Sequence, residues 1–140
     1  MNNYTLDFSG YCWQGLESSV EENSGIYCAY SCRNVNGQML VDRLLYIGRS
    51  DNLRRRLSEH TTSGKFQHEI DQGKSVFYSY AVLDGRSLDA CEAAMIHHFR
   101  PPYNEQSTAA FQGHDATTVT SSGRWAFSVA GTFTESPSQS

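Results

Sequence analysis

The sequence predicts a single α+β domain: a small antiparallel sheet with a three-stranded core, flanked by helices in the order β-β-α-β-α. The length of 140 residues is near the commonest domain size and sufficient for a core without disulfides. The pair Asn36-Gly37 between two apolar runs is the strongest two-residue hairpin signal. Two later segments carry apolar residues at helical spacing, on either side of an alternating segment. The terminal segments are expected to add further strands.

The hairpin gives the first two strands. Residues Gly25 to Arg33 are rich in aromatic and small apolar side chains, and Met39 to Gly48 form the returning strand. If Asn36-Gly37 is the turn, Tyr27 lies directly opposite Tyr46 on one face of the hairpin. A β-bulge would shift this pairing by one residue. An aromatic pair that only stabilises the hairpin is the alternative to a functional pair.

A helix is expected after the hairpin. Ser50 or Asp51 can cap it, and Leu53 and Leu57 recur at a spacing of four, as on the buried face of a helix. A second, shorter helix is expected from Phe66 to Gln72.

The third core strand and the last helix complete the order. Residues Ser75 to Leu83 alternate as in a strand, and Asp84-Gly85 favours a turn. Ser87 can cap a helix that runs to about Phe99. Pro101-Pro102 ends this helix, because proline cannot continue one.

The segments 1–24 and 107–140 lie outside this order. Residues 1–24 carry four acidic and no basic side chains, and Tyr4, Leu6 and Phe8 alternate as in a short strand. Segment 107–140 is rich in Ser and Thr and is expected to contain an edge strand, with residues 136–140 disordered. The residues expected on one face of that strand are Trp125, Phe127, Val129 and Phe133.

Composition argues against several function classes. No run of 18 apolar residues occurs, and the N-terminus lacks a basic segment followed by an apolar stretch. Membrane and secreted classes are therefore not expected, and a cytoplasmic location is. The cysteines form no CxxC pair, which argues against a zinc knuckle and favours buried free thiols. These cysteines are Cys12, Cys28, Cys32 and Cys91.

Charge restricts where a nucleic acid can bind. Eleven Lys and Arg against fifteen Asp and Glu give a net charge of −4, the wrong sign for binding by bulk electrostatics. Residues 49–65, however, carry five basic groups against two acidic ones. A nucleic-acid partner is therefore expected at this local segment. The substrate-binding candidates are Arg49, Arg54, Arg55 and Lys65.

Arg56 and His60 in that segment are four residues apart and share one helix face beside the leucine stripe. A guanidinium that forks onto phosphate oxygens and an imidazole that donates a proton near neutral pH suit a phosphate ligand. A solvated basic face, which Arg54 and Arg55 resemble, is the alternative.

Glu92 falls on the apolar face of the last helix. A carboxylate there needs a partner, either Arg56 in a structural ion pair or a hard divalent cation such as Mg²⁺, and both interpretations stay open. The apolar residues on that face are Leu88, Cys91, Met95, Ile96 and Phe99.

Three polar residues after Glu92 are further candidates for a functional role. Asn104 comes after Pro-Pro-Tyr, where the chain is extended, so its amide can reach back to the preceding helix; a turn asparagine is the alternative. His97 and His98 point about 100° apart on a helix, which favours exposed helix-end histidines over a shared metal ion.

Two tripeptides, Gly25-Ile26-Tyr27 and Tyr46-Ile47-Gly48, lie one on each strand of the hairpin. Together they resemble the two signature words of the GIY-YIG nuclease superfamily. Arg56 and His60, ten and fourteen residues after Tyr46, extend the resemblance, as do Glu92 and Pro102-Tyr103-Asn104. The resemblance covers about residues 25–105. We therefore expect a GIY-YIG nuclease-like domain over 25–106, between extensions 1–24 and 107–140.

The resemblance implies a metal-dependent endonuclease that hydrolyses phosphodiester bonds in DNA, with Mg²⁺ or in its place Mn²⁺, and leaves 5′-phosphate and 3′-hydroxyl ends. Tyr27 is expected to take the proton of the attacking water if Arg56, the metal and His60 lower its pKa from about 10. Without that lowering, the tyrosine is a relay or positioner and His60 becomes the base. The catalytic residues that the resemblance implies are Tyr27, Tyr46, Arg56, His60, Glu92 and Asn104, with Glu92 as metal ligand.

Two alternatives to this function stay open. One is a nucleic-acid-binding or regulatory module that does not cleave. The other is a catalytic subunit whose protein partner or oligomerisation supplies the affinity for DNA. The net charge favours this second alternative over a free-standing, sequence-specific enzyme.

Overall fold

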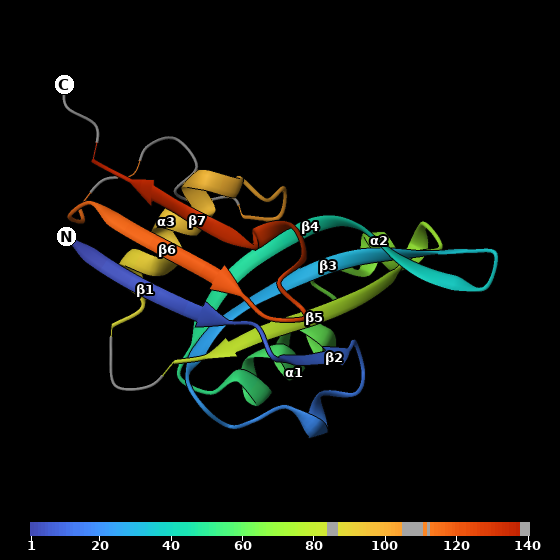
Figure 1. The fold of residues 1–140 in the computed structure, drawn as a ribbon. Helices are drawn as coiled ribbons and strands as arrows, with labels where there is room; N and C mark the ends of the chain where they lie inside the picture. Colours follow the sequence, from blue (N-terminus) through green and yellow to red (C-terminus); the bar gives the residue numbers. More distant parts are fainter. Residues whose placement is uncertain (84–86, 105–110, 112, 138–140) are drawn as a thin grey trace.

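The computed structural model describes residues 1–83, 87–104, 111 and 113–137, and its architecture is the predicted α+β class (Figure 1). The order β3-β4-α1-β5-α3 is the predicted β-β-α-β-α, and α2 is the expected short helix. The strands are β1 (Asn2–Asp7), β2 (Gly10–Trp13), β3 (Gly25–Val35), β4 (Gln38–Ser50), β5 (Ser75–Val82), β6 (Thr117–Ser122) and β7 (Gly131–Glu135). The helices are α1 (Leu53–Ser63), α2 (Gln67–Asp71) and α3 (Asp89–Phe99), with short 3₁₀ turns at Glu17–Ser19 and Phe127–Val129.

The main sheet has the strand order β2-β5-β3-β4, and its three core strands are antiparallel. Successive residues of the central strand β3 point to opposite faces. Cys28 and Tyr30 pack with α3 in one core, whereas Tyr27 and Ala29 pack with α1 in another. Helices α1 and α3 therefore cover opposite faces of the sheet. The four cysteines are buried and free, as expected. No helix among the described residues has the length and apolar character needed to cross a membrane.

The β3–β4 hairpin has the predicted turn but not the predicted register. Asn36-Gly37 forms the turn, with φ angles of 53° and 83°. Two bulges then shift the pairing by two residues, so that Tyr27 lies opposite Gly48 instead of Tyr46. Because two single shifts restore the original face, the rings of Tyr27 and Tyr46 remain neighbours, with centroids 6.0 Å apart. The residues that the bulges insert into β4 are Asp42 and Leu45.

The terminal extensions form a second sheet, of order β1-β6-β7, which packs over α3 (Figure 1). Strand β1 is the short N-terminal strand expected from the sequence. The C-terminal extension contains the expected edge strand, β7, which lies at the edge of this second sheet. The expected strand face of aromatic residues is wrong, because Trp125 and Phe127 lie in turns between β6 and β7. Phe127 has a φ of 51°, which no strand residue adopts and which breaks the alternation. The added edge strand of the main sheet is β2.

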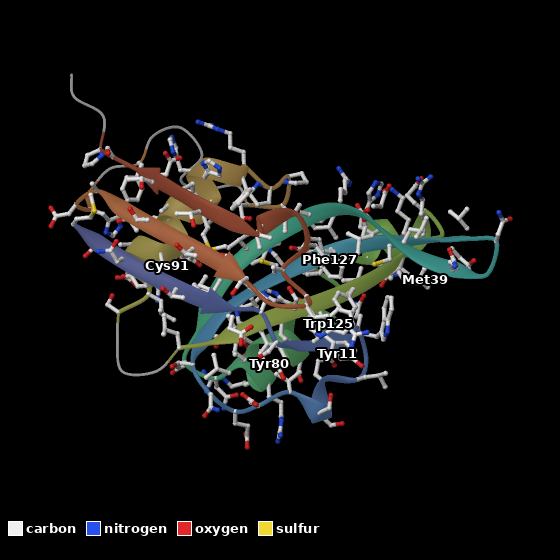
Figure 2. All side chains as sticks on the ribbon, in the orientation of Figure 1. Tyr11, Met39, Tyr80, Cys91, Trp125 and Phe127 are labelled. Atoms are coloured by element: carbon white, nitrogen blue, oxygen red, sulfur yellow. The ribbon has the colours of Figure 1, made fainter. Side chains whose placement is uncertain are left out.

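Aromatic rings connect the two extensions to the main sheet. The ring of Tyr11 lies 4.3 Å from that of Trp125, and Trp125 in turn lies 5.5 Å from Phe77 of β5, measured between ring centroids. Tyr11, Trp125 and Phe127 lie beside one another in Figure 2. These contacts link β2, β5 and the turn before β7.

Two helix starts differ from the sequence prediction. Asn52, and neither of the two residues before it, caps α1; its side chain accepts a backbone N–H of the first turn at 3.0 Å. Helix α3 follows Leu88 and has no side-chain cap, so Ser87 does not cap it. The turn expected at residues 84–85 lies outside the described residues, as do residues 138–140 of the end expected to be disordered.

Candidate active site

The centre of the site is Tyr27, held at the middle of the main sheet. Its ring packs directly on Gly48 of the neighbouring strand, and a Cβ at position 48 would collide with the ring. Gly25 is restricted in a similar way, because its Cβ would collide with the carbonyl oxygen of Ala81. The two glycines therefore allow the close strand approach that buries Tyr27, whose side chain is 1% exposed.

His60 of α1 meets Tyr27 from the helix side. The hydroxyl of Tyr27 lies 2.7 Å from Nε2 of His60, and His60 is only 4% exposed. Burial, together with the positive charges of Arg56 and Lys65, lowers the pKa of His60 to about 4. His60 is therefore neutral at pH 7 and can accept a hydrogen bond at Nε2 if its other ring nitrogen carries the proton.

Tyr27 is also neutral near pH 7. Burial and the neighbouring Tyr46 raise its pKa well above the usual range, and the opposing effect of Arg56 is smaller. The condition for Tyr27 to act as a base by itself, a lowered pKa, is not met, because desolvation outweighs one half-exposed guanidinium and His60 carries no charge. This leaves a neutral hydroxyl–imidazole pair.

Tyr46 lies on the solvent side of this pair. Its ring is 5.4 Å from that of His60 and 6.1 Å from that of Phe66. The ammonium of Lys65 lies 4.5 Å above the centre of the Tyr46 ring, a cation–π contact. Lys65 thereby adds positive charge at the border of the site.

Arg56 and Glu92 line the same surface pocket, of about 640 Å³. Arg56 has a side chain that is 44% exposed and lies 3.4 Å from Glu59, and its positive charge is close enough to Tyr27 to favour the ionised form of that hydroxyl. Its position beside Tyr27 is suitable for a contact between the guanidinium and a phosphate oxygen. The complete lining consists of Arg49, Ser50, Asp51, Arg55, Arg56, Glu59 and Glu92.

Glu92 differs from its predicted environment. Its side chain is 26% exposed instead of lying in the apolar core, and its partner is Arg49 instead of Arg56. Oε2 accepts the backbone N–H of Arg49 at 3.1 Å, and Oε1 accepts Nε of Arg49 at 3.3 Å. Partial burial raises the pKa of Glu92, and the contacts with Arg49 act in the opposite direction. In the structure Glu92 lies at the margin of the apolar face on which the helical period placed it, and its long side chain turns outward.

The donor set around Glu92 fits Mg²⁺. The described residues contain no group of three or more His, Cys, Asp or Glu side chains that together could hold a metal ion. Mg²⁺ does not need such a cage, because it usually retains several waters and binds one or two carboxylates together with substrate phosphate. Glu92, as one carboxylate at the border of a solvent-accessible pocket, matches this coordination.

Asn104 has a structural position. Its Oδ1 accepts the N–H of Ile47 and its Nδ2 donates to the carbonyl of Ile47, both at 2.9 Å. The backbone N–H of Tyr103 donates to Leu45, also at 2.9 Å. Asn104 therefore pairs with the open edge of β4, next to Tyr46, and not with the preceding helix. It positions the strand and does not line the pocket.

The four candidate DNA contacts separate into different environments. Arg49 and Arg55 line the pocket, and Lys65 lies over Tyr46. Arg54 instead turns to the N-terminal extension, where its Nε donates to the carbonyl of Val20 at 2.7 Å and its guanidinium lies 3.4 Å from Glu22. The structure therefore does not bring Arg54 to the pocket.

Glu69 is a buried group for which the sequence pattern contains no signal. It is 2% exposed, accepts the hydroxyl of Tyr103 at 2.7 Å and lies 3.1 Å from the guanidinium of Arg43. These contacts hold the segment that carries Asn104. The Pro102-Tyr103-Asn104 motif contained the tyrosine, but nothing in the sequence named its partner.

His97 and His98 lie away from the site, against β7. Nδ1 of His97 is 2.8 Å from Oε1 of Glu135, and Nδ1 of His98 is 3.7 Å from the same oxygen. The expectation of exposed histidines is wrong for His97, whose side chain is 22% exposed, because β7 of the C-terminal extension covers it.

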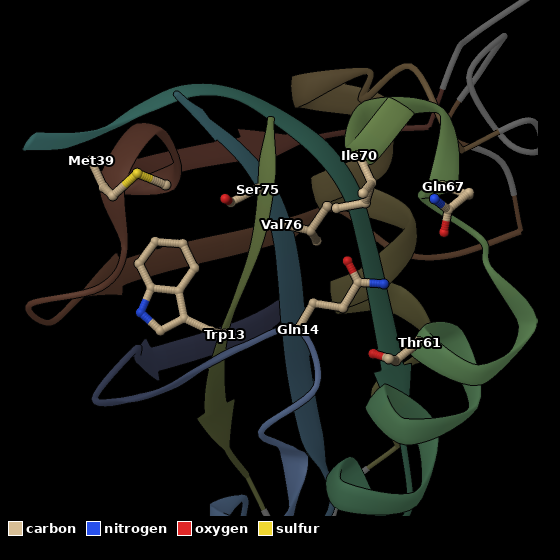
Figure 3. A pocket seen from close by; sticks show the side chains of 8 residues that line it. All are labelled: Trp13, Gln14, Met39, Thr61, Gln67, Ile70, Ser75 and Val76. Carbon is tan, nitrogen blue, oxygen red and sulfur yellow. The ribbon is translucent and has the colours of Figure 1, made fainter. Parts of the chain in front are cut away.

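A larger hollow, of about 740 Å³, lies between the N-terminal extension, the hairpin and α2 (Figure 3). Trp13, Met39 and Ile70 give it apolar walls, and the side chain of Gln14 lies between Val76 and Thr61 in this view (Figure 3). It contains none of the candidate catalytic residues.

Comparison with known proteins gives one match. The model of the GIY-YIG catalytic domain matches residues 23–104, which include all of the candidate catalytic residues. No curated protein and no solved structure matches the chain.

Proposed function

Because the chain belongs to the GIY-YIG family of nuclease catalytic domains, we propose that it is a metal-dependent endonuclease that hydrolyses phosphodiester bonds in DNA. The observation that carries the proposal is the neutral Tyr27–His60 pair, which adjoins Arg56 at a pocket that also contains Glu92. Hydrolysis requires delivery of a water and neutralisation of the charge that develops on the phosphate. A proton acceptor, a fixed cation and a carboxylate that fits a metal ion support both requirements.

Tyr27 and His60 act as a proton relay in this proposal. The hydroxyl oxygen of Tyr27 accepts a proton from the attacking water while its own proton passes to Nε2 of His60, 2.7 Å away. Neither group has to hold a buried negative charge in this exchange. The raised pKa of Tyr27, which argues against a permanently ionised tyrosine, is compatible with the relay.

The other residues bind and orient the substrate. Arg56 holds the phosphate, and Tyr46 fixes a phosphate oxygen or a water beside His60. Glu92 would hold Mg²⁺ or Mn²⁺, which when bound supplies a Lewis acid for the phosphate and the leaving 3′ oxygen. Asn104 keeps Tyr46 in place through the backbone of Ile47.

We also propose that a protein partner or oligomerisation supplies much of the affinity for DNA. The net charge is −4, and each arginine of the pocket already has a carboxylate within 4 Å. Such pairs reduce the attraction of a polyanion, because its phosphates must compete with the carboxylates. The four buried free cysteines support a reducing, cytoplasmic location.

The test is cleavage by the purified chain of duplex, branched and single-stranded DNA, with Mg²⁺ or Mn²⁺ and with chelator. We expect metal-dependent products with 5′-phosphate and 3′-hydroxyl ends. DNA binding without metal-dependent turnover on every substrate would instead favour the non-cleaving module.

Glu92→Gln is the matched variant for this test. It should abolish metal-dependent cleavage and leave the thermal midpoint of the free protein nearly unchanged, because Arg49 is 47% exposed and stays solvated. Mg²⁺ should raise the midpoint of the wild type and not that of the variant. A marked drop in midpoint, with no metal effect in either protein, would make Glu92 a structural residue.

A further inference from the structure

Arg49 is the last residue but one of β4, and it contacts two carboxylates of α3. Its backbone N–H and its Nε bind Glu92, while its Nη2 lies 3.0 Å from Oδ1 of Asp89. Asp89 and Glu92 are three residues apart in the first turn of α3 and therefore share one side of the helix. One guanidinium thus bridges the expected metal ligand and a second carboxylate.

Arg49 also lies between two hollows. The pocket of about 640 Å³ contains Glu92 but not Asp89, and a smaller hollow of about 190 Å³ contains Asp89 but not Glu92. Arg49 lines both of them. Its side chain is 47% exposed, so no packed core restrains rotation of the guanidinium from one hollow to the other.

The guanidinium and a metal ion cannot share Glu92 without cost. Both are positive, and both need the carboxylate oxygens of Glu92. If the guanidinium of Arg49 turns into the smaller hollow, it breaks its contact with Oε1 of Glu92 and retains the ion pair with Asp89. The backbone N–H of Arg49 still supports Oε2 of Glu92 and keeps the carboxylate in place.

We propose that Arg49 is a latch on the metal ligand: its guanidinium bridges Glu92 and Asp89 in the free protein, and it leaves Glu92 and keeps Asp89 when a divalent cation binds Glu92. This inference rests on the proposed function, since it assumes a metal at Glu92. Asp89 is a positioning residue that never touches the cation. It sets the metal affinity by stabilising the displaced guanidinium.

The latch predicts opposite effects of two substitutions. Arg49→Gln removes the competing cation, so Mn²⁺ should bind more tightly. Asp89→Asn removes the alternative partner of Arg49, so Mn²⁺ should bind more weakly. We expect each change to be about fivefold, the size of one partly exposed ion pair. In the Arg49→Gln background, Asp89→Asn should have a clearly smaller effect, because only the loss of its charge remains and no guanidinium is left to be displaced.

The experiment is a calorimetric titration of the full chain with Mn²⁺ alone, without DNA, on the two single variants and the double variant. Asp51→Asn is the matched control, because Asp51 lines both hollows but pairs with Arg55. It removes the same charge and should weaken Mn²⁺ binding equally with and without Arg49. Thermal midpoints of all variants check that the fold is intact. The conservative variant Asp89→Glu keeps the carboxylate and should bind Mn²⁺ with the wild-type affinity.

Two results would overturn the latch. One is a weakening by Asp89→Asn that persists undiminished in the Arg49→Gln background, as for the control. The other is an Arg49→Gln variant that binds Mn²⁺ no more tightly than the wild type. Glu92→Gln separates these results from failure of the proposed function: if it leaves Mn²⁺ binding unchanged, the metal site itself is wrong. If it abolishes binding while Arg49 and Asp89 have no effect, only the latch is wrong.

Discussion

The hydroxyl of Tyr27 lies 2.7 Å from Nε2 of His60, which joins the first signature tripeptide to the helix after the hairpin. Both groups are buried and neutral near pH 7, since desolvation raises the pKa of Tyr27 and lowers that of His60 to about 4. In a relay of this kind the two residues work as one unit, and their substitutions can be used to test it.

Tyr27→Phe removes only the hydroxyl, so it should lower kcat by about 100-fold or more with little effect on the fold. His60→Gln should lower kcat by a similar factor. The double variant should be no worse than the worse single variant, because either change interrupts the same relay. Single-turnover kinetics at saturating DNA measures this. Near-normal activity of Tyr27→Phe, together with loss of activity in His60→Gln, would indicate that His60 alone accepts the proton of the water.

His60 should also make the stability of the protein depend on pH. Its folded pKa of about 4 lies below the unfolded value of about 6.5, so the unfolded chain takes up the proton first as the pH falls. The stabilisation is complete above about pH 6.5 and is lost progressively down to about pH 4. From these pKa values the loss is about 3 kcal/mol.

Urea unfolding of wild type and His60→Gln between pH 4 and pH 7.5 measures this effect. The free energy of unfolding should fall more steeply with acid in the wild type than in the variant. Parallel curves would mean that His60 is not the buried neutral group seen here.

The element order could be predicted because it depends on local signals: one Asn-Gly turn, two helical periods and one proline pair. The hairpin register could not, because the bulges at Asp42 and Leu45 have no residue signature in this strand. Turn propensity does not explain Gly25 and Gly48, the glycines of the two signature tripeptides. Gly48 is needed because the ring of Tyr27 occupies the space of a Cβ.

The site residues could be named from spacing, but their partners could not. Successive residues of a helix are about 100° apart, so the spacing does not distinguish the middle of the apolar face from its margin. Glu92 lies at the margin, where a long side chain reaches solvent. Arg54 and Arg55 are adjacent and identical in type, and only contacts distant in sequence distinguish them. Arg54 binds Val20 of the N-terminal extension, whereas Arg55 lines the pocket.

This difference makes the three consecutive arginines a set of matched variants. Arg55→Ala should weaken DNA binding and flatten its salt dependence without changing turnover at saturation. Arg56→Ala should lower turnover itself, because Arg56 adjoins Tyr27. Arg54→Ala should change neither and lower the thermal midpoint slightly, since it loses the contact with Val20. Binding isotherms at several salt concentrations, with kcat at saturation, measure all three; equal effects would contradict these positions.

Asn104 distinguishes a positioning role from a catalytic one. Its amide satisfies both backbone groups of Ile47, which is fully buried. Asn104→Ala leaves that N–H and carbonyl without these partners, which should cost about 1–3 kcal/mol per group. We therefore expect a clear drop in the free energy of unfolding, and a loss of kcat that follows from displacement of Tyr46.

Asn104→Asp is the companion variant, because it keeps the shape and the acceptor for the N–H of Ile47 but removes the donor to its carbonyl. It should destabilise the protein as well. The effect should be strongest at pH values at which the new carboxylate is ionised, because the position is only 9% exposed and burial of a charge is unfavourable. Mn²⁺ binding should survive in both variants at temperatures well below their midpoints, because Glu92 lies on α3. Urea unfolding, Mn²⁺ titration and kcat measured on the same preparations decide the role. A loss of kcat at unchanged stability would show that Asn104 acts on the substrate itself.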